Sequence, residues 1–246
     1  MRIGGSELVR DLAGAALDVL YPRTCTACGA LDPEDGRHLC WDCLAAIRFI
    51  QPPYCSRCGD PVAGRVDHEY LCPACIRGPI FFDTARSAAH YESPLADSIR
   101  LLKYHKGLWA ASDLAEMLFA ALTAHFDPGL IEAVGFVPLF PARRRKREYN
   151  QSEVLARALC RRAGLSLLKN GLVRIRPTPT QTHLTASARA DNVRDAFRAR
   201  NPKWLKDRRI LLVDDVMTTG ATVNECARVL REAGAAKVWA LTVARG

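Results

Sequence analysis

Four pairs of cysteines in the first third of the chain constrain its fold more than any other feature of the sequence. Each pair has the spacing Cys-x-x-Cys, and the eight residues are Cys25, Cys28, Cys40, Cys43, Cys55, Cys58, Cys72 and Cys75. Two residues between cysteines let a tight turn point both thiolates at one ion, and two such turns complete a tetrahedral site. The second and third cysteines of each set of four are separated by 11 residues (Cys28 to Cys40) and 13 residues (Cys58 to Cys72), close to zinc-ribbon spacing. The sequence therefore predicts two Zn²⁺ sites, one on the first four cysteines and one on the last four.

The cysteine pairs also form an internal repeat. The motif Cys-x-x-Cys-Gly opens at Cys25 and again thirty residues later at Cys55, and each opening pair is followed by a pair that lacks the glycine. Gly29 and Gly59 suit a backbone with positive φ that turns amides toward sulfur. Residues 1–80 are too short and too polar to fold around an apolar core alone, so we expect the zinc to be structural.

Two other chemistries use the same cysteines. Disulfide bonds need an oxidising compartment, and no secretory signal is visible in the sequence. A rubredoxin-like iron site has the same four-thiolate ligand set.

The role of residues 1–80, which carry the cysteine pairs, also has two interpretations. Residues 1–80 carry a net charge of −2, which favours a structural or protein-contact role over direct contact with nucleic-acid phosphates.

The composition is that of a globular protein. The 246 residues (27.1 kDa) are 49% hydrophobic and 25% charged. No stretch approaches the roughly 18–20 uncharged apolar residues of a membrane-spanning helix. Apolar positions at helical spacing between Glu7 and Tyr21 are interrupted by charges, which predicts an amphipathic helix over residues 1–22 rather than a secretory signal. We therefore expect a cytoplasmic protein with no membrane insertion.

From Phe82 onward, short apolar runs alternate with amphipathic segments. The expected strands cover residues 84–91, 133–139, 172–175, 209–213 and 238–243, and the expected helices cover residues 95–104, 108–126, 152–163 and 222–233. This alternation predicts an α/β domain with a mainly parallel sheet and helices on both faces. In such sheets ligands bind at the carboxyl ends of the strands.

One segment places two acids and a threonine-glycine loop at such a strand end. Ile210 to Val213 predict a buried strand, Asp214 and Asp215 follow it, and a loop then leads into a helix. The loop residues are Thr218, Thr219, Gly220, Ala221 and Thr222. Free amides at a helix start, together with threonine hydroxyls, form a phosphate cradle. Two adjacent carboxylates would repel phosphate, so they must face hydroxyls or a metal, and a ribose 5-phosphate would satisfy the whole segment.

Two other interpretations fit an apolar strand that ends in two aspartates. It resembles the magnesium-side strand of a P-loop ATPase, but that fold needs a Gly-Lys dipeptide and the chain contains none. The second is a structural turn with no ligand. The charge distribution favours an anionic ligand, because residues 141–209 hold 19 basic and 5 acidic side chains. The tight run from Arg143 to Arg147 stands out from this background, and it also fits a nucleic-acid patch.

The segment from Ile210 to Thr222 resembles the phosphoribosyl-pyrophosphate (PRPP) motif of type I phosphoribosyltransferases. With a double zinc ribbon in front, nearly the whole chain resembles the ComF/GntX family, competence-associated proteins with a phosphoribosyltransferase-like domain. The stretch from Val137 to Gln151 carries a second part of the resemblance. A weaker part runs from Arg174 to Phe197, with matching positions at Gln181, Leu184, Arg189 and Asn192.

This resemblance implies roles for individual residues. Asp214 and Asp215 would hold the ribose hydroxyls, the loop would hold the 5-phosphate, and the turn after Pro138 would hold pyrophosphate. Residues 178–192 resemble a flap that closes over the sugar. The implied PRPP-binding residues are Lys103, Arg143, Gln181, Asp214, Asp215, Val216, Met217, Thr218, Thr219, Gly220, Ala221 and Thr222, and the implied catalytic residues are Asp214, Asp215 and Arg147.

The resemblance further implies three regions: a helix (1–22), a double zinc ribbon (23–80) and a phosphoribosyltransferase-like domain (81–246). The implied reaction displaces pyrophosphate at ribose C1, with Mg²⁺, arginines and amides offsetting the charge of the leaving group.

Three hypotheses about the function follow. The protein is a phosphoribosyltransferase with an unspecified acceptor, a competence protein that handles incoming single-stranded DNA beside other competence proteins, or a non-catalytic PRPP sensor that binds partners.

Overall fold

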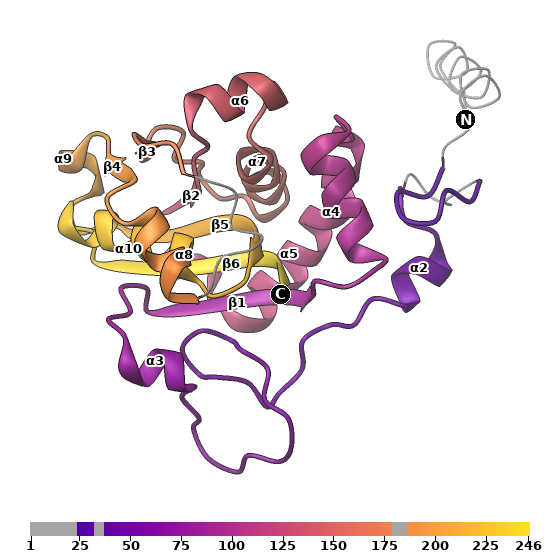
Figure 1. The fold of residues 1–246 in the computed structure, drawn as a ribbon, viewed down its shortest axis with the longest axis horizontal. Coiled ribbons are helices and arrows are strands. Elements are labelled where there is room, and N and C mark those ends of the chain that lie inside the picture. Colours follow the sequence, from indigo (N-terminus) through magenta and orange to yellow (C-terminus); the bar gives the residue numbers. More distant parts are fainter. Residues whose placement is uncertain (1–23, 32–36, 179–185) are drawn as a thin grey trace, which may run out of the picture.

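The computed structural model describes residues 24–31, 37–178 and 186–246 (Figure 1). The helix expected over residues 1–22 and the candidate ligand Gln181 lie outside these ranges. The strands are β1 (Thr84–His90), β2 (Ala133–Phe136), β3 (Leu172–Arg174), β4 (Phe197–Ala199), β5 (Arg209–Met217) and β6 (Lys237–Arg245). The helices are α2 (Trp41–Ala45), α3 (Pro73–Arg77), α4 (Leu95–Tyr104), η1 (Leu108–Ala110), α5 (Ala111–His125), η2 (Pro128–Leu130), α6 (Pro141–Arg147), α7 (Gln151–Ala163), α8 (Ala186–Val193), α9 (Pro202–Leu205) and α10 (Ala221–Glu232).

Four strands form a parallel sheet in the order β1-β6-β5-β2. The apolar run of β5 lies between two layers: Leu211 and Val213 face helices α4, α5 and α7, whereas Ile210 and Leu212 face α10 and the β3–β4 pair. All four side chains are buried, as expected for a parallel strand that is covered on both faces. The predicted α/β fold with helices on both faces is confirmed.

Strand β5 is longer than the sequence pattern predicts. The expected strand 209–213 continues to Met217, because β6 keeps pairing beyond the apolar run and places Thr242 opposite Asp214. Strand β2 is shorter than predicted and ends at Phe136. Pro138 follows closely, and its missing N–H cannot continue a ladder. The two aspartates, expected at the carboxyl end of the strand, therefore lie inside the last part of β5.

The expected strand 172–175 exists but lies outside the main sheet. Strand β3 pairs antiparallel with β4, which the sequence pattern did not predict. Helices α6, α8 and α9 were also missed. Helix α6 forms from the basic run, with Pro141 at its first position and Glu148 in the left-handed conformation (φ 70°) at its end.

The two cysteine regions pack against different sides of the α/β domain (Figure 1). In the first region, the backbone N–H groups of His38 and Leu39 both donate to Asp113 of α5, at 2.8 Å. In the second region, the backbone N–H of Ala85 in β1 donates to the carbonyl of Arg57, at 2.7 Å. Cysteines of both regions belong to the buried cores of the α/β domain. The first cysteine region is therefore attached to helix α5, and the second is attached to the edge strand β1.

Candidate functional site

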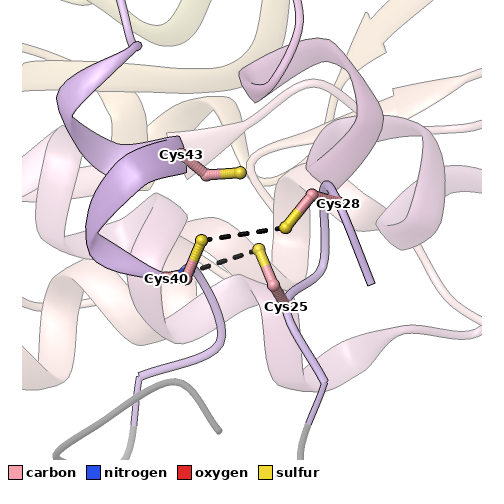
Figure 2. A group of neighbouring side chains, drawn as sticks. All are labelled: Cys25, Cys28, Cys40 and Cys43. Atoms are coloured by element: carbon pink, nitrogen blue, oxygen red, sulfur yellow. Dashed lines mark hydrogen bonds between the residues drawn. The ribbon is translucent and has the colours of Figure 1, made fainter. Parts of the chain in front are cut away.

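The first cysteine group brings four side chains together at two turns of the chain (Figure 2). The ligand atoms of Cys25, Cys28, Cys40 and Cys43 all lie within 4.8 Å of one another. The sulfurs of Cys28 and Cys40 are 3.7 Å apart, and a tetrahedral zinc with Zn–S bonds of about 2.3 Å needs roughly this spacing. Burial raises the pKa of Cys25, but the backbone N–H groups of Cys28 and Cys40 outweigh it and lower that pKa to about 6. The group therefore fits Zn²⁺ as predicted.

The second group consists of Cys55, Cys58, Cys72 and Cys75, and all four side chains are buried. The sulfurs of Cys58 and Cys72 are 3.6 Å apart, again the spacing of a tetrahedral zinc site. Arg245, at the end of β6, donates to the carbonyl of Cys58 at 2.9 Å and pairs with Asp60 at 2.8 Å. The second group is therefore linked to the last strand of the parallel sheet through the side chain of Arg245.

The two aspartates of β5 are buried in a network that reaches two other elements, α7 and α4. Ser152, in the first turn of α7, donates its hydroxyl to Oδ1 of Asp214 at 2.7 Å. Lys103 of α4 places Nζ 3.1 Å from Oδ1 of Asp215. The other oxygen of Asp215, Oδ2, is buried with no hydrogen-bond partner in the structure. An unpartnered buried carboxylate oxygen needs a ligand hydroxyl or a cation, so this site fits a diol or Mg²⁺.

Burial and the charge of Asp215 raise the pKa of Asp214 to about 7, although the Ser152 hydroxyl and Lys103 oppose the shift. Burial alone would lower the pKa of Lys103, but the charge and hydrogen bond of Asp215, together with the charge of Asp214, raise it. The site thus holds an ammonium with a raised pKa beside a carboxyl, Asp214, whose pKa is raised to about 7.

The threonine-glycine loop joins β5 to α10 beside these acids. A pocket there is lined by the backbone and side chains of Asp214, Val216, Met217, Thr218, Thr219, Gly220, Ala221, Thr222 and Val223. Gly220 has φ +77°, which other residues rarely adopt, and a Cβ at this position would lie 3.1 Å from Cε of Met217. The sequence-predicted loop therefore forms the wall of a small concave site at the carboxyl end of β5.

The neighbouring strand β2 supplies a second side of the site. Its last residues lie beside β5, and the N–H of Val137 donates to the carbonyl of Val213 at 3.1 Å. Asn150 caps α7 and donates its side-chain amide to the carbonyl of Val137 at 2.9 Å. Asn150 therefore fixes the turn after β2 next to Ser152, and neither residue was a sequence candidate.

Two basic residues of α6, Arg143 and Arg147, contact different parts of the domain. Arg143 donates to the backbone carbonyl of Thr178 at 3.3 Å. Arg147 lies over the ring of Tyr104 at 4.8 Å and donates to Gln151 at 3.1 Å. Arg147 is therefore held beside the C-terminal end of α4, whereas Arg143 contacts Thr178, the first residue of the 178–192 segment.

Arg174 of β3 is a buried cation that sequence reasoning named only as the edge of a match. It lies over the ring of Phe197 at 5.2 Å and donates to the hydroxyl of Thr178. Burial, followed by the charge of Arg143, lowers the pKa of Arg174, and the charge of Asp214 opposes this shift. No sequence signal separates a buried arginine from the many exposed ones, because burial depends on the unpredicted β3–β4 pairing.

Two family models match the chain. The model described as double zinc ribbon domain matches residues 16–76, and the model described as phosphoribosyl transferase domain matches residues 118–246. Fold and site together therefore define a class: a type I phosphoribosyltransferase-like domain that follows a double zinc ribbon with two four-cysteine sites.

Relatives identify the family within this class. The chain is 34% identical over 209 residues to "Competence protein F" of Haemophilus influenzae, covering 82% of this chain and 89% of that protein. It has the same identity and coverage with "DNA utilization protein YhgH" of Escherichia coli K12. The chain belongs to the family of these competence and DNA utilization proteins.

Among solved structures, a glutamine PRPP amidotransferase from B. subtilis aligns with a TM-score of 0.36 at 21% identity, over 54% of this chain and 25% of that one. Among the helices within the described ranges, none is both long and apolar enough to cross a membrane.

Proposed function

We propose that the protein binds PRPP with Mg²⁺ at the carboxyl ends of β5 and β2. One observation carries this proposal. A buried carboxylate oxygen of Asp215 has no hydrogen-bond partner, and the strand that carries it, β5, leads directly into the pocket formed by the threonine-glycine loop. The aspartates suit ribose hydroxyls and Mg²⁺, and the loop amides suit the 5-phosphate. The phosphoribosyl transferase match over residues 118–246 supports the same ligand.

The proposal includes transfer of the phosphoribosyl group to an acceptor that the site does not specify. The bond from ribose C1 to pyrophosphate breaks and a bond from C1 to the acceptor forms, with pyrophosphate leaving. Arg143 and Arg147 would offset the charge of the leaving group, and Mg²⁺ would supply further neutralisation when bound. A PRPP-sensing protein without turnover would bind the same ligand but release no pyrophosphate.

The Gly220 position tests the phosphate part of the site. Gly220→Ala places a side chain in a strained backbone and against Met217, so we expect PRPP affinity to fall at least about tenfold. Gly164→Ala is the matched control, because Gly164 has a similar positive φ (+67°) but nothing within 4 Å of a Cβ. Equal affinity in the two variants would contradict a phosphate site at this loop.

A second function, contact with single-stranded DNA during competence, is supported by an exposed aromatic-basic surface. Tyr104 and Trp109 are 61% and 50% exposed, and Arg147 of the basic helix α6 lies over the Tyr104 ring. Exposed aromatic rings beside cations are the elements on which bases stack in single-strand binding proteins. The family names, which refer to competence and DNA utilization, agree with this function.

Binding of a fluorescent oligothymidylate tests the DNA function. We expect Tyr104→Ala to weaken binding about tenfold, in keeping with about 1–3 kcal/mol per stacked base. Trp204→Ala, an exposed tryptophan of α9 on the far side of the domain, is the control. Equal affinity of the two variants would exclude stacking on Tyr104.

We also propose that the protein works in the cytoplasm, because cysteine thiolates that bind zinc stay reduced there.

A further inference from the structure

A cavity of about 300 Å³ lies apart from the site on β5. Ala133, the first residue of β2, lines it, and Ala133 pairs with Ile210 near the start of β5. The cavity is therefore at the amino ends of these parallel strands, whereas Asp214 and the threonine-glycine loop lie toward the carboxyl end of β5. Its volume is at the lower end of the range for small-molecule sites, which suits one small ligand.

The lining of this cavity combines an aromatic ring with basic and amide side chains. Trp204 of α9 is 41% exposed and forms part of the wall. Lys169 and Arg200 supply two cations, and Asn170 and Asn201 supply two carboxamides. Among the described residues that line the cavity there is no acid, and neither cation has an ion-pair partner within the described ranges. The cavity therefore offers positive charge to an anion and a ring surface to a planar group.

Backbone hydrogen bonds hold together the segments that carry the two cations. The loop after α7 runs beside β2, because the N–H of Val134 donates to the carbonyl of Ser166 at 2.8 Å and the N–H of Leu168 donates to the carbonyl of Val134 at 2.9 Å. The N–H of Arg200, just after β4, donates to the carbonyl of Gly171 at 2.9 Å. The walls of the cavity are therefore formed before any ligand binds.

Trp204 is held in place by a residue that does not line the cavity. The guanidinium of Arg208 lies over the indole ring at 5.0 Å. Arg208 also donates to Glu132 at 3.0 Å, and Glu132 accepts a hydrogen bond from the backbone N–H of Arg209 at 3.1 Å. This acid is thereby occupied outside the cavity and leaves the charge of its lining uncancelled. A ring that is already held loses little conformational freedom when a planar group stacks on it.

We propose that this cavity binds a free purine nucleoside monophosphate, with its base on Trp204 and its phosphate on Lys169 and Arg200. Aromatic side chains stack on bases, and arginine and lysine bind phosphate. Asn170 and Asn201 each carry a donor and an acceptor, which the edge of a base can match. The two fused rings of a purine offer a larger stacking area than a pyrimidine. The inference does not depend on PRPP binding at β5.

Calorimetry on the zinc-loaded full-length protein tests the proposal with AMP, adenosine and CMP as probes. We expect AMP to bind most tightly, because adenosine lacks the phosphate and CMP lacks the purine. The double variant Lys169→Met/Arg200→Met should bind AMP about 10–100-fold more weakly, as for the loss of charged hydrogen bonds, and adenosine as the parent does. Lys203→Met is the control, because Lys203 is an exposed lysine of α9 that does not line the cavity.

Two further variants locate the ligand. Trp204→Ala, with its folding checked by circular dichroism, should bind AMP about tenfold more weakly through the loss of stacking. The folded double variant Asp214→Asn/Asp215→Asn should bind AMP as the parent does. Loss of AMP binding in this aspartate variant, parental AMP affinity in the cavity variants, or no AMP binding by the parent would overturn the inference.

A single-stranded oligodeoxyadenylate distinguishes a free nucleotide from a strand. It should bind Trp204→Ala as it binds the parent, and weaker binding would assign this tryptophan to a nucleic acid and overturn the inference. PRPP affinity should be parental in Lys169→Met/Arg200→Met. A parent protein that binds AMP but not PRPP would overturn the proposed function alone, so the two failures are distinct.

Discussion

The ammonium of Lys103 lies 3.1 Å from Oδ1 of Asp215, and this ion pair joins α4 to the central strand β5. The two side chains are 16% and 6% exposed, so water does little to screen the pair. Lys103 therefore has a defined task in this fold: it supplies the cation that pairs with the buried Asp215 side chain, next to a second buried carboxyl, Asp214.

Replacing Lys103 tests this task. Lys103→Met leaves the Asp215 carboxylate buried without its cation, and we expect the free energy of unfolding to fall by about 3 kcal/mol. Lys106→Met is the control, because the Lys106–Glu148 pair is exposed and such pairs contribute little. Urea unfolding measures both variants, and equal stability of the two would contradict a structural role for the buried pair.

The raised pKa of Asp214 predicts a pH dependence of stability. Folding raises this pKa from 3.8 to about 7, so the folded state keeps the proton that the unfolded state loses. The stabilising contribution of the protonated carboxyl is complete below about pH 4 and disappears as the pH rises through about 7. Urea unfolding between pH 5 and 8 should show this decline in the unliganded protein. Asp214→Asn should lack it, and an identical pH profile would contradict the assignment.

Ligand binding should show the opposite dependence on pH. If Asp214 binds ribose hydroxyls or Mg²⁺ as a carboxylate, PRPP binding at pH 6.5 releases its proton, and affinity rises toward pH 8. Calorimetry in two buffers with different ionisation enthalpies measures the protons released. The PRPP phosphate also titrates in this range, so Asp214→Asn in the same buffers isolates the protein group. Equal proton release by both proteins would contradict a role for this carboxyl.

The two metal sites should differ in how fast they lose zinc. Cys28 of the first group is exposed and Cys40 is partly so, whereas all four cysteines of the second group are buried. We predict about two zinc ions per chain, as two four-thiolate sites require, with one removed much faster by a chelator. Cys28→Ser should abolish the fast phase alone. A metal content near one, or dominated by iron, would contradict the account.

Arg245 should stabilise the second metal site. It pairs with Asp60 and donates to the carbonyl of Cys58, so Arg245→Met should cost about 2 kcal/mol and speed release of the slower zinc. Arg65→Met removes an ion pair that is almost fully exposed and serves as control. Zinc release at the parental rate in Arg245→Met would show that the contact is not needed to hold the metal.

The sequence predicted the features that depend on local pattern. The Cys-x-x-Cys spacing correctly predicted which eight cysteines form the two groups, because each turn involves only neighbouring residues and the pairs repeat along the chain. The parallel sheet followed from the alternation of apolar runs and amphipathic helices. The threonine-glycine loop was also found, because φ > 0 at Gly220 and a following helix leave a local signature.

The sequence could not predict features that depend on contacts between distant segments. The Lys103–Asp215 pair joins residues in α4 and β5, and nothing in either segment identifies its partner. The burial of Arg174 depends on the antiparallel pairing of β3 with β4, two strands of only three residues each. The length of β5 likewise depends on its pairing with β6, so the aspartates, expected at the carboxyl end of the strand, lie within it.

The central claim is that Asp214, Asp215 and the loop after them form a working PRPP site. Calorimetric titration of PRPP with Mg²⁺ into the zinc-loaded full-length protein tests it most directly, beside the double variant Asp214→Asn/Asp215→Asn with its folding checked by circular dichroism. The account predicts binding of PRPP by the parent and its loss in the folded variant. Binding of PRPP by the variant with parental affinity, or no binding by the parent, would contradict it.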